Sequence, residues 1–182
     1  MPEWTELSKI ALQGLTLVVA GIGLVFAICQ IRLLTTTYND FHEWNRRKAA
    51  QDAIEKYTDI QEYYPLLNAK FRIMEFFDPV SLDLIRKECE VDSSLRPTLH
   101  RVLNYFEALA VGCGQGVYDE QVVGNAFKAV FIRTLKQFEA YIGHRRSAGA
   151  IGAWSQFEQL AKKWRSEEEE KVERRPQTGR DA

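Results

Sequence analysis

The chain has little of the chemistry that marks catalytic, metal-binding or disulfide-stabilised proteins. Its 182 residues include three cysteines, an odd number with no Cys-x-x-Cys pair, which fits a reducing compartment rather than a disulfide framework. The three histidines lie far apart, with no His-Glu-x-x-His motif and no cysteine at zinc-ligand spacing. A formal net charge of -1 gives no indication of a nucleic-acid partner. We therefore expect no catalytic residue, no cofactor, no metal and no nucleic acid.

One glycine-rich run, Gly112 to Gly116, superficially resembles a phosphate-binding loop. Such loops follow a strand and open a helix, and they add a Lys-Ser/Thr pair or a distal acidic residue. This run instead follows a predicted helix, and neither addition is in place. It is typical of a helix C-terminus followed by a tight turn.

The chain also lacks strand-like alternation of apolar and polar residues, whereas apolar residues recur at helical spacing along most of its length. This pattern predicts an all-α protein, with one N-terminal transmembrane helix followed by an antiparallel cytoplasmic helical bundle of about five helices. We assign residues 1–9 to a short tail and 10–34 to the transmembrane helix and its exit. Residues 35–164 then form the helical domain, and 165–182 a charged, flexible tail.

The longest apolar run is Ile10 to Cys29, with no charged residue and only Gln13 and Thr16 polar. As a helix it would extend about 30 Å, the thickness of the hydrocarbon core of a bilayer, so residues 10–29 are expected to contact membrane lipid. A cleaved signal peptide would have a basic start and a shorter apolar core, whereas Glu3 and Glu6 precede this run. We favour a retained anchor, and a cleaved signal and a buried core helix are the alternatives.

Basic residues near the span indicate its orientation. Lys9 precedes the span, whereas Arg32 and the run Arg46 to Lys48 follow it. This bias places the N-terminus outside and the large domain in the cytoplasm. Aromatic residues after the span are either interfacial anchors or the start of the soluble core, and both interpretations stay open for Tyr38, Phe41 and Trp44.

Small and polar residues of the span share one helical face, because their spacing alternates between three and four positions. They are Gln13, Thr16, Ala20, Gly23, Ala27 and Gln30. In lipid such a face lets helix backbones approach closely and hydrogen-bond across the contact. It predicts that the span pairs with itself or with another span, and the alternative is chance placement in an anchor that contains Gly and Ala.

Within the domain, the β-branched run Thr35 to Thr37 is expected to weaken the helix that leaves the membrane. One helix is then predicted up to Tyr64, followed by a helix over 66–77 and another over 82–91 that is capped by Ser81. Three further amphipathic stripes predict the remaining helices, and their first apolar residues are Leu99, Phe127 and Ile151.

The C-terminal tail is nearly all polar from Arg165 onward. Glu167 with Lys171, and Glu170 with Arg174, are favourable i, i+4 pairs on a helix. We therefore expect the last helix to continue into solvent before it ends near Pro176.

Asn104 and Glu107 lie three residues apart on a helix that is otherwise rich in core residues. A polar pair in that position predicts a buried hydrogen-bond node that clasps the following turn, with Tyr118 and Asp119, and also Arg133. A ligand site formed by the same residues is the alternative.

The same segment carries a resemblance to a known family. Asn-x-Phe-Glu at 104–107, the glycine-rich turn, Gly-x-Tyr-Asp-Glu at 116–120 and an amphipathic helix with an arginine resemble a family of uncharacterised bacterial proteins. Its members have one N-terminal span and a helical cytoplasmic domain of unknown function. The resemblance covers residues 35–142 and implies a place in the bacterial inner (plasma) membrane. It implies no enzymatic activity.

These features favour a membrane-anchored, non-enzymatic interaction module that tethers, scaffolds or regulates a partner. The partner is another protein or a second copy of the chain, bound through the span or the helical bundle. The alternative is an oligomerising membrane effector, of the stress-response or anti-phage type, with a cytoplasmic sensing domain. An enzyme acting on lipid or nucleotide is a third class, and it would need a convergent acidic or histidine pocket.

Overall fold

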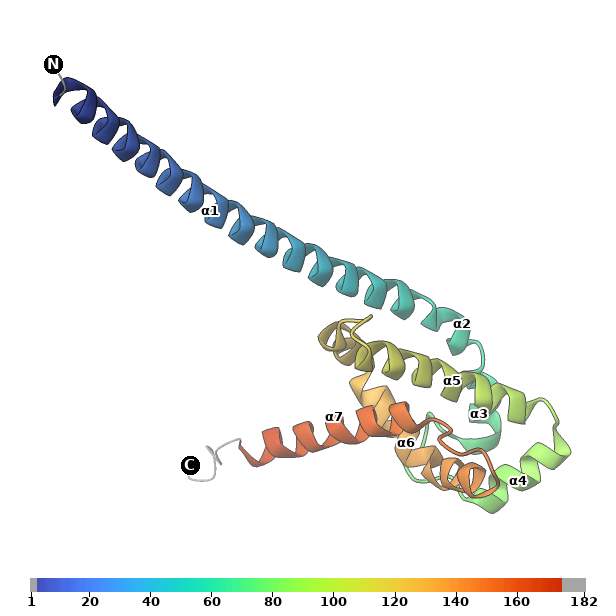
Figure 1. The fold of residues 1–182 in the computed structure, drawn as a ribbon. Helices are drawn as coiled ribbons and strands as arrows, with labels where there is room; N and C mark the ends of the chain where they lie inside the picture. The colour runs from blue at the N-terminus through green and yellow to red at the C-terminus, as the bar shows by residue number, and fades with distance from the viewer. Residues whose placement is uncertain (1–2, 175–182) are drawn as a thin grey trace. The chain divides into compact units, whose positions relative to one another are not determined.

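The computed structural model describes the backbone of residues 3–174 and the side chains of residues 21–174, and every regular element within them is a helix (Figure 1). The contacts divide the chain into two units, Met1–Asn45 and Arg46–Ala182. The all-α prediction is confirmed, with six further helices rather than about five beside the long apolar one. The helices are α1 (Glu3–Glu55), α2 (Tyr57–Gln61), α3 (Tyr64–Phe71), α4 (Leu82–Val91), α5 (Leu95–Gly114), α6 (Glu120–Ser147) and α7 (Ser155–Glu173).

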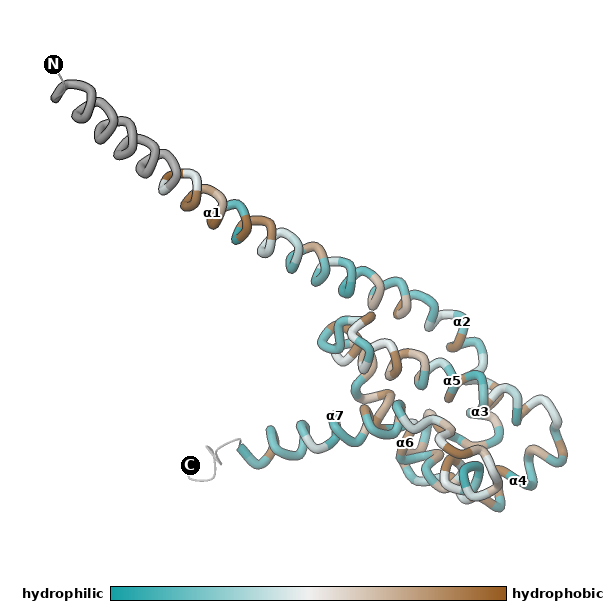
Figure 2. Tube along the Cα trace, in the orientation of Figure 1, coloured by the Kyte–Doolittle hydropathy of each residue, from teal (hydrophilic) through white to brown (hydrophobic). Residues whose placement is uncertain are grey.

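α1 is an uninterrupted helix of 53 residues. The run Thr35 to Thr37, expected to weaken the helix, does not end it. The three hydroxyls donate to the carbonyl oxygens four residues earlier, at 2.9 Å for Thr35 and 3.0 Å for the other two. These bonds keep each hydroxyl satisfied inside the helix, so the β-branched run is tolerated there. Figure 2 shows the described part of α1 changing from mainly hydrophobic to mainly hydrophilic along its length.

By length and composition, α1 is the helix among the described residues that is able to cross a membrane. Its side chains from Gly21 to Trp44 are exposed and not packed in a core, and Ile22, Val25 and Phe26 are 66%, 62% and 63% exposed. This exposure argues against the buried core helix as an interpretation of the described part of the run. Lipid is the solvent in which a helix with so many exposed apolar side chains is stable.

The helix predicted up to Tyr64 is divided, since α1 ends at Glu55 and α2 covers Tyr57–Gln61. The last helix starts at Ser155, so Ile151, which was predicted to open its apolar stripe, lies before it and is exposed.

Pro65 lies in the first turn of α3, where its missing N–H costs nothing. α3 ends at Phe71 and not at residue 77 as predicted, because Arg72 takes a left-handed conformation, with φ of 52°, that terminates the helix. α4 has the predicted bounds, and the Ser81 hydroxyl accepts a hydrogen bond from the N–H of Leu84 at 3.2 Å.

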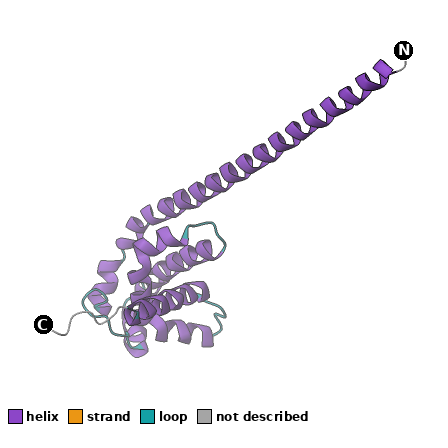
Figure 3. Cartoon of the chain, turned by 90° about the vertical axis from the view of Figure 1, so that its left-hand side faces the viewer, coloured by secondary structure: helices purple, strands orange, loops and turns teal. Residues whose placement is uncertain are grey.

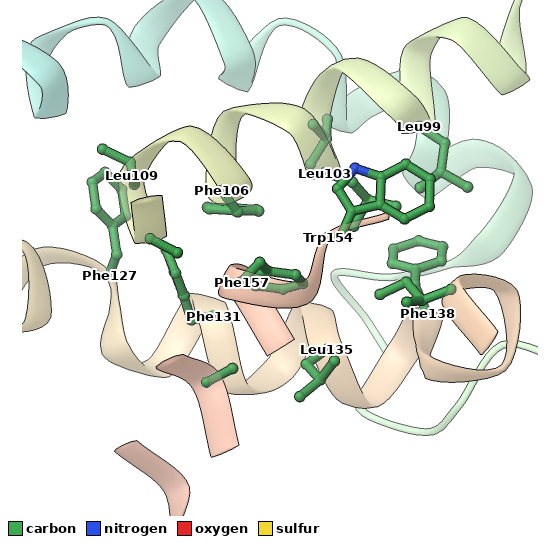
Figure 4. Packing of buried hydrophobic residues seen from close by; sticks show 14 of the residues in the cluster. Leu99, Leu103, Phe106, Leu109, Phe127, Phe131, Leu135, Phe138, Trp154 and Phe157 are labelled. Carbon is green, nitrogen blue, oxygen red and sulfur yellow. The ribbon is translucent and has the colours of Figure 1, made fainter. Parts of the chain in front are cut away.

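The apolar core of the second unit lies where α5, α6 and α7 meet, and short loops join most of its helices (Figure 3). Figure 4 shows the predicted apolar stripes of α5 and α6 turned toward one another, with Phe157 of α7 between them. The Phe157 ring stacks on Phe106, with centroids 5.6 Å apart, and meets Phe131 edge-on at 5.2 Å. These offset and edge-on arrangements add to the stabilisation that burial of the rings provides.

The glycine-rich run closes α5 as a turn, in agreement with the sequence. The carbonyl oxygen of Gly112 accepts from the N–H groups of Val117 and Tyr118, at 2.9 and 3.0 Å. Gly116 has φ of +68°, a conformation that glycine adopts without strain. A Cβ atom at Gly112 would lie 2.2 Å from the Tyr118 ring, so only glycine fits beneath that ring.

Candidate functional site

Asn104 and Glu107 hold the start of α7 against α5. The Asn104 Oδ1 atom accepts from the indole N–H of Trp154 at 2.8 Å. Glu107 accepts from the backbone N–H of Phe157 at 2.8 Å and from that of Gln156 at 3.3 Å. The first N–H groups of a helix lack intrahelical partners, and the N-cap residue of α7 provides no side-chain bond. Glu107 therefore caps α7 from a neighbouring helix, with its negative charge at the positive end of the helix dipole.

Tyr118 and Asp119 instead organise the start of α6. The Asp119 carboxylate accepts from the N–H groups of Gln121 and Val122, at 2.9 and 3.3 Å, and pairs with Arg47 at 3.3 Å. Burial raises the pKa of Asp119, but the two backbone bonds and Arg47 outweigh it and leave the pKa below its ordinary value. Asp119 thus caps α6, and backbone bonds to the Gly112 carbonyl close the turn, so neither depends on Asn104 or Glu107.

Arg133 lies elsewhere again, with its guanidinium 4.2 Å from the centroid of the Phe77 ring. The prediction that the five residues form one node clasping the following turn and Arg133 is therefore corrected. Asn104 and Glu107 bind the start of α7. Tyr118 and Asp119 lie in the α5–α6 turn, and Arg133 contacts the loop after α3. Helical spacing places residues on a face, but it does not indicate which distant segment that face meets.

Gln137 shapes the loop before α4, and sequence reasoning did not single it out. Its side chain is 3% exposed, and its amide donates to the carbonyl oxygens of Ile73 and Phe76 at 2.7 and 2.8 Å. Its backbone carbonyl accepts from the N–H of Val80 at 2.9 Å. The sequence did contain one signal for this role, because Gln137 is a polar residue next to Phe138 on the apolar stripe of α6. Gln137 fixes the loop so that Met74, Phe76 and Phe77 stay exposed at its surface.

The loop and α6 together border a groove of about 630 Å³ on the side of α6 that faces away from the core. Phe77 forms one wall, and small or apolar α6 residues such as Ala129 and Ile132 form the floor. Volumes of roughly 300–1,000 Å³ are typical of sites that accommodate a ligand or an anchoring side chain. The remaining lining residues are Gly124, Asn125, Ala126, Lys128, Arg133, Lys136 and Glu168.

The acidic part of α7 closes one end of this groove. Lys128 pairs with Glu167 at 3.0 Å and with Glu168 at 2.8 Å. The predicted pair of Glu167 with Lys171 is therefore wrong, since Lys171 pairs with Glu168 at 3.3 Å, whereas the pair of Glu170 with Arg174 is present. Bonds to α6 thus hold a segment that was expected to be fully solvated. The part of the predicted tail beyond residue 174 lies outside the described residues.

The predicted pairing face of the span is described only in part. Gln13, Thr16 and Ala20 lie outside the residues whose side chains are described. Ala27 and Gln30 are exposed, and a Cβ atom at Gly23 would have no atom within 4 Å. Nothing else in the described part of the chain therefore requires a small residue at Gly23.

Two of the three cysteines, Cys89 and Cys113, are buried, and Cys29 is exposed. Burial raises the pKa of Cys89, and burial raises that of Cys113 to about 11, so both thiols stay protonated near neutral pH. His100 is half-buried and bonded to the Tyr141 hydroxyl at 2.8 Å, and burial lowers its pKa. Within residues 21–174, no group of three histidine, cysteine or acidic side chains is arranged to hold a metal ion.

The described part of the chain is all-helical, with one helix able to cross a membrane and a compact unit that carries a groove. The chain belongs to the family described as Domain of unknown function (DUF4760), whose profile matches residues 17–164. The resemblance drawn over residues 35–142 lies inside this range and is consistent with an uncharacterised family. No curated protein and no solved structure matches the chain.

Proposed function

We propose that this protein is a non-enzymatic interaction module of the bacterial inner membrane, anchored by α1 with its N-terminus outside. The helical unit then binds a partner in the cytoplasm and tethers, scaffolds or regulates it. The observation that carries the proposal is that one chain contains both an exposed apolar helix, α1, and a helical unit whose groove and loop present apolar surface. Exposed apolar patches of this kind typically mark interaction sites.

The groove supports partner binding through its chemistry. Met74, Phe76 and Phe77 are 59%, 49% and 53% exposed, although large apolar side chains are usually buried. Arg133 and Lys136 on the rim are cations, and Arg133 lies over the Phe77 ring. Aromatic residues and arginine are enriched at the centres of protein interfaces, so this surface suits another protein better than it suits catalysis.

Site-specific photo-crosslinking of the full chain in its native membrane tests the proposal. A photoreactive residue replaces Phe77, and a matched control replaces Ile151, which is 94% exposed and does not line the groove. We expect one abundant crosslinked partner from position 77 and none from position 151. Ala129→Arg, which fills the groove from an exposed α6 position, should abolish that product, whereas Ala148→Arg should leave it unchanged.

The same experiment separates the two functional classes. Products that contain a second protein favour the interaction module, whereas products of three or more copies of this chain without a second protein favour the oligomerising membrane effector. Equal labelling from positions 77 and 151 would contradict the groove as a binding surface. Recovery of the full chain without detergent, in the soluble fraction, would contradict membrane anchoring.

A further inference from the structure

α1 carries exposed apolar side chains beyond the length that a bilayer covers. A span of twenty residues takes about 30 Å of helix, and α1 continues after Cys29 without a break. Leu34, Tyr38 and Phe41 are 68%, 63% and 59% exposed in that continuation. Large apolar side chains on a helix in water are stable when another helix covers them, so their spacing indicates what covers them.

One row of apolar residues on α1 repeats every 3.5 positions. Starting at Leu24, steps of three and four residues alternate without exception, and they define a seam of six residues. The seam consists of Leu24, Ala27, Ile31, Leu34, Tyr38 and Phe41. This is the a and d pattern of a heptad repeat, which keeps one face of a helix in contact with a partner helix over several turns.

Charged residues avoid the faces that a partner helix would meet. Between Gly21 and Asn45 the charged residues are Arg32, Asp40 and Glu43. With Leu24 at position a, they occupy positions b, c and f, which point away from a partner. Positions a, d, e and g of this segment are all uncharged, so two copies can align in register without placing like charges opposite each other.

The surface of α1 also has a shallow, open depression. Its lining includes Leu34, Thr37, Tyr38 and Phe41, together with Thr35. The first four residues stand at i, i+3, i+4 and i+7, which is the set that forms a hole for one side chain of a facing helix in a coiled coil. The depression is centred on Tyr38 of the seam.

We propose that α1 forms a parallel, two-stranded coiled coil with α1 of a second copy of this chain, through the seam from Leu24 to Phe41. Ile31 at position a and Leu34 at position d favour two strands. Ala27 lets the helices approach closely in lipid. The parallel orientation rests on the proposed function, because a shared anchor gives both copies the same direction and depth in the membrane.

Cysteine scanning of the full chain in native membranes tests the coil. In a Cys29→Ser background, where the other two cysteines are buried, single cysteines replace Leu34, Tyr38 and Phe41 on the seam. Matched controls replace Thr36, Asp40 and Glu43 on the opposite face. Mild oxidation should give at least five-fold more disulfide-linked dimer from each seam position than from its control. Since identical positions must meet, this pattern also reports a parallel alignment.

Other crosslinking patterns would overturn the proposal. They are equal yields on both faces, a maximum on the face of Asp40, or absence of dimer at every position. A second variant, Phe41→Glu, should convert the dimer to a monomer by mass measurement in detergent, whereas Asp40→Lys should not. Fractionation of the same samples reports anchoring separately, so failure of the anchor and failure of the coil give different results.

Discussion

Single polar side chains decide how the helices of the second unit are fastened. Glu107 of α5 satisfies two N–H groups at the start of α7, and Asn104 one turn earlier holds the indole of Trp154. Both residues lie on a helix whose buried side chains are apolar apart from Thr98. Their role is therefore to fix which end of α7 lies against α5, a contact that apolar packing alone specifies weakly.

Replacement of Glu107 by alanine tests this capping role. Glu107→Ala leaves two helix-terminal N–H groups without their acceptor and should lower the free energy of unfolding by about 1–3 kcal/mol. Glu107→Gln keeps an acceptor oxygen and should cost less. Denaturant unfolding followed by tryptophan fluorescence measures both variants. Unchanged unfolding in Glu107→Ala, combined with lost activity in cells, would instead assign Glu107 to a ligand site.

Whole helices show two different faces in this protein. α6 turns Phe131 and Leu135 to the core, while Ala129 and Ile132 on its other side line the groove. Thr134 and Gln137 are the polar residues on the buried face, and Gln137 donates to the loop after α3. Its hydrogen bonds add to the burial of Ile73 and Val80, so the geometry of that loop depends in part on α6.

Gln137→Leu should release the loop while leaving the rest of α6 in place. Two carbonyl oxygens, those of Ile73 and Phe76, lose their donor, and a buried acceptor without a partner costs about 1–3 kcal/mol. Hydrogen exchange should accelerate in residues 72–80, and unfolding should occur at lower denaturant concentration. The exposed Gln121→Leu variant at the start of the same helix is the control. Equal exchange rates of residues 72–80 in both variants would show that the loop keeps its conformation without Gln137.

At the level of the complete chain, the compact unit begins inside α1. Ala50 is fully buried and Ala53 is 8% exposed, and the carbonyl oxygen of Ala53 accepts from the Tyr105 hydroxyl at 2.9 Å. The unit boundary at Arg46 therefore lies later than residue 35, where the sequence placed the start of the domain. The last turns of α1 belong to the core rather than to a linker.

Truncations on either side of this boundary should behave differently. A chain that starts at residue 46 should be soluble, helical and cooperative in unfolding, because it keeps Ala50 and Ala53. A chain that starts at residue 57 should lose several kcal/mol or fail to fold, since it exposes the core that these residues cover. Circular dichroism with thermal unfolding measures both. A stable fragment from residue 57, or strong β signal in the longer one, would contradict this description.

Sequence periodicity predicted the elements better than it predicted their contacts. The bounds of α4, its Ser81 cap, the turn at Gly112 and the buried stripe of α6 follow from local rules that act within a few residues. The end of α3 was missed because it depends on Arg72 in a left-handed conformation, which no residue type there announces. The threonine run was expected to weaken the helix, and α1 nevertheless continues through it, because the low propensity of three residues does not by itself end a long helix.

Local chemistry thus determined that this protein is helical and that its first helix is apolar enough to enter a membrane, because helix formation and lipid solubility both depend on residues close in the chain. Tertiary structure alone decided that Glu107 caps α7, that Lys128 binds Glu167 and Glu168, and that Gln137 holds the loop bordering the groove. These partners are separated by tens of residues. Which of them meet depends on how the helices pack, and helical spacing carries no record of that.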